Sequence, residues 1–173
     1  MKKKYGLTVR WTHFPLHPET PDSGISLEEL FRGRGYDIEA MKQRMSGLMA
    51  EENLPFGNRT HTYNSRLAQE LSKWGDSFPE GDALNRKLFE AYFAEGRNLA
   101  EPDVLLAVAE AAGLSREAAE DVIRKRLFRN AVDADWRRAH EFGVTGVPTF
   151  VSGNRRLVGA QPYDALDQLI RME

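Results

Sequence analysis

Residues 5–14 carry the alternation of apolar and polar side chains that predicts a β-strand near the start of the chain. Side chains at every second position of this run are apolar, namely Leu7, Val9 and Trp11. A period of two places them on one face of a strand, where they can pack against a core. Pro15 and Pro18 mark the end of the predicted strand.

A hairpin is predicted near the other end of the chain. The β-favouring runs 149–151 and 156–158 flank Gly153 and Asn154, a pair suited to a tight turn. Pro148 directly precedes the first run, and proline belongs at the first residue or the edge of a strand because it donates no ladder hydrogen bond. We predict that the Val147–Pro148 peptide bond is cis.

The region between these strands has the apolar spacing of three and four residues that is typical of helices. Ser26 with Glu29 has the spacing of a capping box, and Asp82 and Ser115 are further predicted N-caps. The predicted helices begin after Ser26, cover about residues 37–53, 63–74, 82–93, 101–113, 115–127 and 130–142, and end with a helix from Pro162.

The order of strand, about six helices, hairpin and helix indicates an α/β fold, in which one small sheet is interrupted by a helical insert. We predict one domain formed by residues 1–24 and 129–173, and a helical insert domain formed by residues 25–128. Within the insert, one helix carries a Met-rich stripe that is predicted to fill the core, formed by Ile38, Met41, Met45, Leu48 and Met49.

Composition and charge narrow the classes of function. The chain has 173 residues and a formal net charge of −2, which gives no reason to expect nucleic acid or a membrane surface as a partner. No apolar segment follows Lys2 to Lys4, so we expect neither a secretory signal nor a membrane span. We therefore expect a cytoplasmic location. The absence of cysteine excludes disulfides, thiolate nucleophiles and zinc ribbons within these residues.

The titratable candidates are the four histidines, at His13, His17, His61 and His140. None of them stands in a metal-ligand pattern, so we predict no metal, no cofactor and no catalytic residue. Residues 60–68 form a polar segment that enters a helix, where Asn64 or Ser65 is suited to be the N-cap. The same segment is also suited to line a cleft between the insert and the sheet.

Two segments near the C-terminus carry the most specific pattern in the chain, Gly143-Val144-Thr145-Gly146-Val147-Pro148-Thr149-Phe150-Val151 and Leu157-Val158-Gly159-Ala160-Gln161-Pro162. The segments 9–18 and 63–68 extend the pattern over essentially the whole chain. Together these segments resemble the DsbA-like thioredoxin-fold proteins, and among them the cytoplasmic, polyketide-cluster-type branch of disulfide oxidoreductases.

The resemblance implies a thioredoxin-like domain split by an all-helical insert, with Val147–Pro148 as the cis-proline loop. In such proteins the backbone of this loop pairs with an extended peptide, so the implied partner is an extended peptide or a protein thiol substrate. The implied substrate-binding residues in this sequence are Thr145, Gly146, Val147, Pro148, Phe14 and Asn64.

One departure from the family pattern concerns its chemistry. The family begins with a strand and a helix carrying Cys-x-x-Cys, and this sequence contains neither; Met1 to Tyr5 resembles the end of that helix. Three explanations stay open: a truncated or mis-started oxidoreductase, a natural remnant that closes the gap by rearrangement or as a homodimer, and a peptide-binding protein without the chemistry. Disulfide exchange by thiols of these residues is impossible, because the thiolate is the nucleophile.

A different class of enzyme is the alternative that the resemblance leaves open. The kappa-type glutathione transferases and the hydroxychromene-carboxylate isomerases share the split architecture and use bound glutathione in place of a protein dithiol. The residues 159–162 are more similar to the oxidoreductase branch, so we rank this alternative second.

Overall fold

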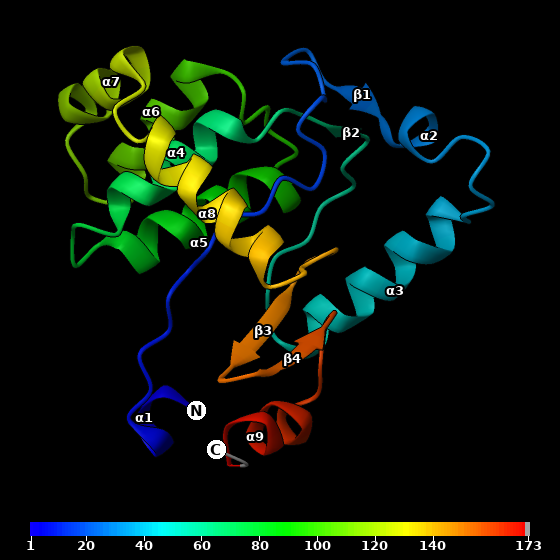
Figure 1. Cartoon of the computed structure of the whole chain (residues 1–173). Coiled ribbons are helices and arrows are strands. Elements are labelled where there is room, and N and C mark those ends of the chain that lie inside the picture. The colour runs from blue at the N-terminus through cyan, green and yellow to red at the C-terminus, as the bar shows by residue number, and fades with distance from the viewer. Residues whose placement is uncertain (172–173) are drawn as a thin grey trace. The chain divides into compact units, whose positions relative to one another are not determined.

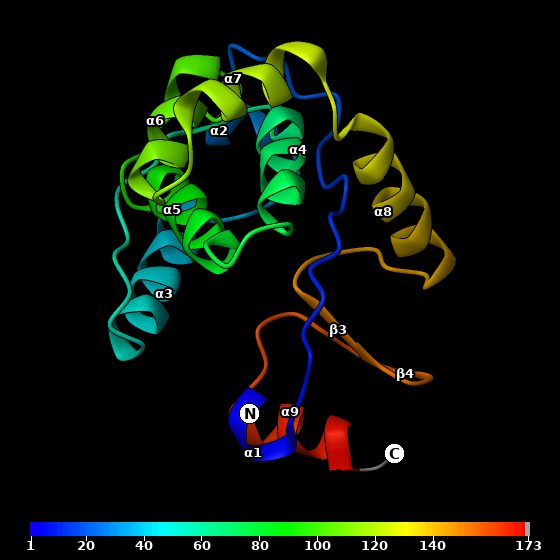
Figure 2. The same ribbon diagram turned by 90° about the vertical axis from the view of Figure 1, so that its left-hand side faces the viewer.

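The computed structural model describes residues 1–171. Figures 1 and 2 show its elements in two views at right angles. In chain order they are α1 (Lys2–Tyr5), β1 (Ile25–Ser26), α2 (Leu27–Leu30), α3 (Ile38–Glu51), β2 (His61–Thr62), α4 (Arg66–Gly75), α5 (Gly81–Phe93), α6 (Pro102–Ala111), α7 (Arg116–Lys125), α8 (Arg129–Glu141), β3 (Thr149–Ser152), β4 (Arg155–Val158) and α9 (Tyr163–Arg171).

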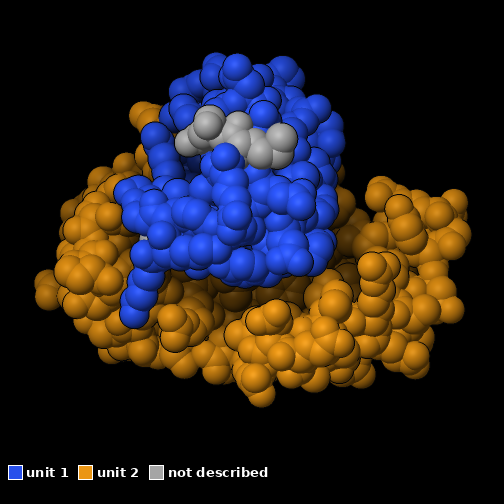
Figure 3. Space-filling model, turned by 90° about the horizontal axis from the view of Figure 1, so that it is seen from below, with its two compact units in different colours: residues 1–16, 133–173 blue, residues 17–132 orange. Residues whose placement is uncertain are grey.

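The chain divides into two compact units, which Figure 3 colours separately. Unit 1 consists of residues 1–16 and 133–173, and unit 2 consists of residues 17–132. The predicted domains, 1–24 with 129–173 and 25–128, stay a prediction. The structure describes no helix long and apolar enough to cross a membrane within residues 1–171.

Unit 2 holds the main apolar core, which lies among helices α4 to α7 (Figure 2). Leu71, Leu84 and Leu105 are fully buried there, one on each of α4, α5 and α6. Local sequence signals set the limits of these helices: Pro102 opens α6, and the Ser115 hydroxyl caps α7 by accepting the Ala118 N–H at 3.2 Å. The predicted Ser115 cap is therefore confirmed.

An ion cluster around one buried carboxylate joins α4 to the end of α7. The Glu70 carboxylate, 1% exposed, accepts hydrogen bonds at 2.7 Å from the guanidinium groups of Arg66 and Arg126. Burial raises the pKa of Glu70, but the hydrogen bonds from Arg126 and Arg66 outweigh it and hold that pKa below its ordinary value. Arg126 is the C-cap residue of α7 and adopts a left-handed backbone conformation with φ of 52°.

Unit 1 contains the predicted hairpin. Strands β3 and β4 pair antiparallel with Ser152 opposite Arg155, so the turn consists of Gly153 and Asn154 as predicted. Helices α1 and α9 lie side by side in Figures 1 and 2. Asp167 of α9 joins them, because its carboxylate accepts hydrogen bonds from the Lys4 ammonium at 3.0 Å and the Tyr5 hydroxyl at 2.7 Å. The bond from Tyr5, with that from Lys4, lowers the pKa of Asp167 despite its burial.

The strand predicted for residues 5–14 is wrong. Tyr5 ends α1, and residues 6–15 have no regular structure; Val9 and Trp11 are 49% and 47% exposed. A strand exists only as part of a ladder, and no described strand within residues 1–171 forms a ladder with this segment. The alternation of side chains was present, but the backbone lacks the neighbour that would turn it into a strand.

Two further predictions in unit 2 are corrected. None of the residues of α3 is buried, so its Met-rich stripe does not fill the core. Asp82 is not an N-cap, since α5 begins at Gly81 with Glu80 as its N-cap, and Asp82 lies in the first turn. A residue suited to capping also stabilises the first turn through the helix dipole, so the two roles are hard to separate from sequence.

Other helix limits agree with the predictions. Asp37 caps α3 and Ser26 caps α2 through their side-chain oxygens, with Glu29 donating its N–H to the Ser26 hydroxyl at 3.0 Å. Strands β1 and β2 were not predicted, because two-residue strands carry no periodic signal; Ile25 pairs with Thr62 between them.

Candidate functional site

The loop of residues 143–148, here named the Pro148 loop, connects α8 to β3. Gly143 has a φ of 61° and donates its N–H to the His140 carbonyl at 2.8 Å, while the Val144 N–H bonds to the Ala139 carbonyl at 3.0 Å. This pattern of left-handed glycine and backward hydrogen bonds is a common way to end a helix. The loop therefore leaves α8 in a fixed direction.

Side chains of the hairpin fix both ends of the Pro148 loop. The Arg156 guanidinium donates to the Phe142 and Gly143 carbonyls, each at 2.8 Å. The Thr149 hydroxyl donates to the Gly146 carbonyl at 2.6 Å. These bonds hold the loop against the hairpin that follows it, so its exposed part is presented on an ordered support.

The middle of the Pro148 loop keeps its backbone groups available. Within residues 1–171, the backbone N–H and C=O groups of Thr145 and Val147 form no hydrogen bond. Val147 is 49% exposed, and the Val147–Pro148 bond is cis, the isomer predicted from the sequence. The Pro148 carbonyl accepts the Gly159 N–H at 2.7 Å and continues the β3–β4 ladder by one pair. An exposed backbone with free donors and acceptors is able to pair with another extended chain.

The outer edge of β3 extends this available backbone. Ser152 and Arg155 flank the two-residue turn as a hydrogen-bonded pair, and such pairs alternate along an antiparallel ladder. Thr149 and Val151 consequently direct their backbone N–H and C=O groups away from β4. No described strand pairs with this edge in the part of the chain that the structure covers.

The six predicted substrate-binding residues fall into three places. Thr145, Gly146, Val147 and Pro148 are contiguous in the Pro148 loop. Phe14 is half-buried in the irregular segment of unit 1, where the neighbouring His13 N–H bonds to the Asp135 carboxylate at 3.2 Å. Asn64 belongs to unit 2. The binding role of each stays a prediction.

Asn64 has a clear structural task in unit 2. Its amide donates to the Thr20 carbonyl at 2.8 Å and the Pro18 carbonyl at 3.3 Å, and its side-chain oxygen accepts the Arg66 N–H at 2.9 Å. Ser65 is the N-cap residue of α4 but makes no side-chain cap bond. Asn64 thus joins the 17–20 loop to the start of α4, and it satisfies a free N–H in the first turn.

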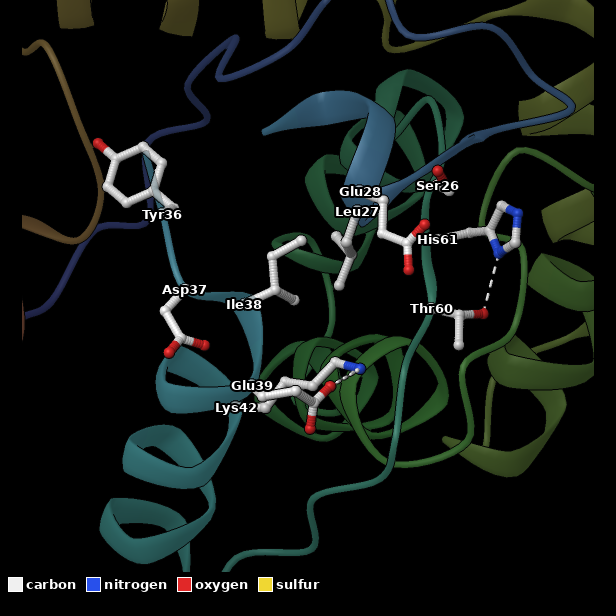
Figure 4. A pocket seen from close by; sticks show the side chains of 10 residues that line it. All are labelled: Ser26, Leu27, Glu28, Tyr36, Asp37, Ile38, Glu39, Lys42, Thr60 and His61. Carbon is white, nitrogen blue, oxygen red and sulfur yellow. Dashed lines mark hydrogen bonds and ion pairs between the residues drawn. The ribbon is translucent and has the colours of Figure 1, made fainter. Parts of the chain in front are cut away.

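A pocket of about 520 Å³ lies elsewhere in unit 2 (Figure 4). Its lining residues are Ser26, Leu27, Glu28, Tyr36, Asp37, Ile38, Glu39, Lys42, Thr60 and His61. Polar groups of its lining are partly engaged with each other: the Lys42 ammonium lies 3.2 Å from the Glu39 carboxylate, and the Thr60 hydroxyl lies 2.9 Å from the His61 ring. None of the predicted substrate-binding residues lines this pocket.

The described residues offer no metal site. No group of three or more histidine, aspartate or glutamate side chains is placed to hold a metal ion within residues 1–171. The residues of the Pro148 loop, 143–148, are also free of titratable side chains. The loop itself therefore offers backbone groups, the Thr145 hydroxyl and apolar side chains, and no charged or acid–base group.

One contribution to the loop was missed by the sequence analysis. The two hydrogen bonds that Arg156 donates to the Phe142 and Gly143 carbonyls link β4 to the end of α8, and a Cβ added at Gly143 would lie 2.7 Å from that guanidinium. An arginine on an exposed strand carries no sequence signal for such a role. Its partner carbonyls are known only when the hairpin is folded.

Comparisons with known proteins agree with this description of the fold. A family model described as a DSBA-like thioredoxin domain matches residues 1–171. Among curated proteins, the uncharacterised protein YwbO of Bacillus subtilis is 26% identical over 171 residues, which are 95% of this chain and 82% of YwbO.

Two solved structures are similar over most of the chain. A probable DsbA oxidoreductase from Streptomyces coelicolor has a TM-score of 0.83 and 25% identity, covering 91% of this chain and 71% of that one. A 2-hydroxychromene-2-carboxylate isomerase has a TM-score of 0.72 and 22% identity, covering 97% of this chain and 80% of that one. The second likeness concerns the fold alone.

Proposed function

Because the chain belongs to the family of DSBA-like thioredoxin domains, we propose that it is a relative of thiol–disulfide oxidoreductases that binds an extended peptide at the Pro148 loop. The fold is thioredoxin-like, of the α/β class, with an all-helical insert. In this proposal the redox reaction is not carried out by the residues of this sequence, since they include no cysteine to supply a thiolate.

The observation that carries the proposal is the free backbone of Val147 at an ordered, exposed loop. Its N–H and C=O groups lack partners within residues 1–171, and the outer edge of β3 continues the same row of donors and acceptors. A peptide added to such an edge gains main-chain hydrogen bonds that do not depend on its sequence. This suits a protein whose substrates are extended segments of many sequences, including protein thiols.

The predicted residues of the Pro148 loop take distinct roles in this proposal. Thr145 and Val147 supply the backbone groups, Gly146 gives the peptide room to approach, and Pro148 directs the chain into β3. The binding roles of Phe14 and of Asn64 stay separate predictions, and the proposal does not depend on them. The cytoplasmic location belongs to the same proposal, and fractionation of cells would check it.

The first experiment measures peptide binding by calorimetry with a Gly146→Ala variant. A Cβ at Gly146 meets no atom within 4 Å, so the variant keeps the fold, but its methyl group stands where the peptide would pass. We expect the affinity for an extended apolar peptide to fall by about tenfold, the effect of losing one or two well-formed contacts. Gly47→Ala, on α3, is the matched control, because its Cβ also meets no atom within 4 Å, and it leaves the affinity unchanged.

A second peptide separates backbone pairing from other modes of binding. N-methylation at alternate residues removes the peptide N–H groups that would pair with the loop and with β3. We expect the methylated peptide to bind at least about tenfold more weakly than the parent peptide. Equal binding of the two peptides, or an unchanged affinity in Gly146→Ala, would refute the proposed mode.

A glutathione-dependent activity is the second candidate. The observation in its favour is the fold likeness to the 2-hydroxychromene-2-carboxylate isomerase, which covers 97% of this chain. Titration with glutathione distinguishes the candidates: saturable binding favours the isomerase-type function, and no binding together with peptide binding favours the proposal above.

A further inference from the structure

Helix α3 exposes an apolar face that the described structure leaves uncovered. Met41, Met45 and Leu48 are 43%, 45% and 40% exposed, and no residue of α3 is buried. Their spacing of four and three residues places them along one side of the helix, here named the α3 stripe. An apolar helix face of this kind is stabilised when a second helix covers it.

Two charged residues flank the α3 stripe on the same side. Arg44 and Glu51 are seven residues apart, which is two turns of the helix and about 10 Å along its axis. Within residues 1–171 neither side chain forms an ion pair or a hydrogen bond. Glu51 is the last residue of α3, where the helix dipole disfavours a negative charge, so its position does not serve the stability of the isolated helix.

We propose that the α3 stripe is the contact between two copies of this chain, with their α3 helices packed antiparallel. In this arrangement Met45 of one copy packs against Leu48 of the other, and Arg44 of each copy lies beside Glu51 of the other. The two-fold axis repeats every contact, which is the ordinary symmetry of a homodimer. The interface is independent of the Pro148 loop and of any disulfide chemistry.

Charge complementarity is the reason to choose a second copy as the occupant. The order of charges along the flank is positive and then negative, so reversing the direction of a second α3 brings opposite charges together twice. A parallel pair would not bring them together, because equivalent residues then lie at the same level and Arg44 stays about 10 Å along the axis from Glu51 of the other copy. A peptide of unrelated sequence has no reason to match this order.

The size of the stripe predicts a reversible dimer. A standard stable interface buries about 800 Å² on each partner, and three half-exposed side chains with one flanking ion pair each way supply less than this. We therefore expect association in the micromolar range, seen as a rise in the weight-average mass with concentration.

Sedimentation of the full chain with charge-reversal variants tests the inference. Arg44→Glu and Glu51→Arg each place like charges together, and we expect each to raise the dissociation constant by about tenfold or more. The double variant Arg44→Glu with Glu51→Arg restores opposite charges and returns the constant to within about threefold of the original. Gln43→Glu, on the opposite side of α3, is the matched control and leaves it unchanged.

The orientation has its own test, because the chain contains no cysteine. Chains carrying Met45→Cys are mixed with chains carrying Leu48→Cys and oxidised. We expect cross-links between the two kinds of chain in excess over cross-links within each kind.

Several results would overturn the inference. They are a monomer at all concentrations, single reversals without effect, a double variant that fails to recover, and cross-links within each kind only. If the α3 stripe were instead covered by other residues of the same chain or by a bound peptide, the chain would stay monomeric or the single charge reversals would have no effect. Circular dichroism of each variant confirms the helices, whose core includes no side chain of α3.

Discussion

Glu70 is a single side chain on which the connection between α4 and the end of α7 depends. It is buried, and two arginines meet at its two oxygens. A buried charge of this kind adds little over an apolar contact of the same size, but removing one partner leaves the others unpaired. The cluster therefore makes unit 2 sensitive to any change that neutralises Glu70.

We predict that Glu70→Gln lowers the free energy of unfolding by about 2 kcal/mol, since Arg66 and the partly exposed Arg126 lose the buried carboxylate to which they donate. Urea denaturation measures this change. Glu39→Gln is the control, because the Glu39–Lys42 pair is exposed and is worth less than about 1 kcal/mol. Equal effects of the two substitutions would contradict the structural role of the cluster.

The pH dependence of stability follows from the same residue. The pKa of Glu70 is lower in the folded state, so the unfolded chain binds its proton first as the pH falls. The resulting stabilisation is complete above the unfolded pKa of about 4.3 and is lost as the pH falls through the folded pKa. When the pH is lowered below about 4.5, we expect the urea concentration at the unfolding midpoint to fall in the original chain. We expect a smaller fall in Glu70→Gln.

At the scale of elements, Asn64 shows how a loop is joined to a helix. We predict that Asn64→Ala lowers the free energy of unfolding by about 1–2 kcal/mol, because the Thr20 carbonyl and the Arg66 N–H lose their partners. Asn130→Ala, exposed on α8, is the control and changes it by less than about 0.5 kcal/mol. If the folded Asn64→Ala variant also binds peptide more weakly, the predicted contact of Asn64 with substrate is supported in addition to its structural role.

The sequence predicted the elements that depend on local signals. The caps Ser26 and Ser115, the start of α3 after Asp37 and the turn at Gly153 and Asn154 are set by side chains within a few residues. It did not predict which elements find partners. The alternation at residues 5–14 and the apolar spacing of α3 both imply burial, yet burial depends on other segments that no local pattern describes.

The candidate site divides in the same way. The resemblance implies the residues Thr145 to Pro148 as site residues, because they form one contiguous motif that can be read in the sequence. The anchoring of the loop by Arg156 does not, since it joins residues 13 and 14 positions apart through a folded hairpin. Whether Phe14 and Asn64 contact a substrate remains a prediction.

At the scale of the whole molecule, the two units differ in how their stability arises. The apolar core lies among helices of unit 2, whereas unit 1 relies on a two-stranded hairpin and on Asp167 between α1 and α9. A two-stranded hairpin is marginally stable by itself. We therefore expect unit 1 to open more readily than unit 2.

Hydrogen exchange measures this difference. We predict that the amides of α4 to α7 exchange slowest and those of β3 and β4 exchange much faster. Leu105→Ala, at a fully buried position, lowers the stability of unit 2 by about 3 kcal/mol and speeds exchange in α4 to α7. The control is the hairpin itself, whose exchange stays unchanged; an equal increase there would show that the units unfold together.

The hairpin has one more consequence, which concerns the behaviour of the protein in concentrated solution. Strand β4 carries Arg155 and Arg156, and like charges oppose the stacking of strands from different molecules. Strand β3 carries Thr149, Phe150 and Val151 and no charged side chain. The outer edge of β3 is therefore the template on which chains would aggregate into fibrils, and a lysine introduced at Val151 would act as a gatekeeper against that assembly.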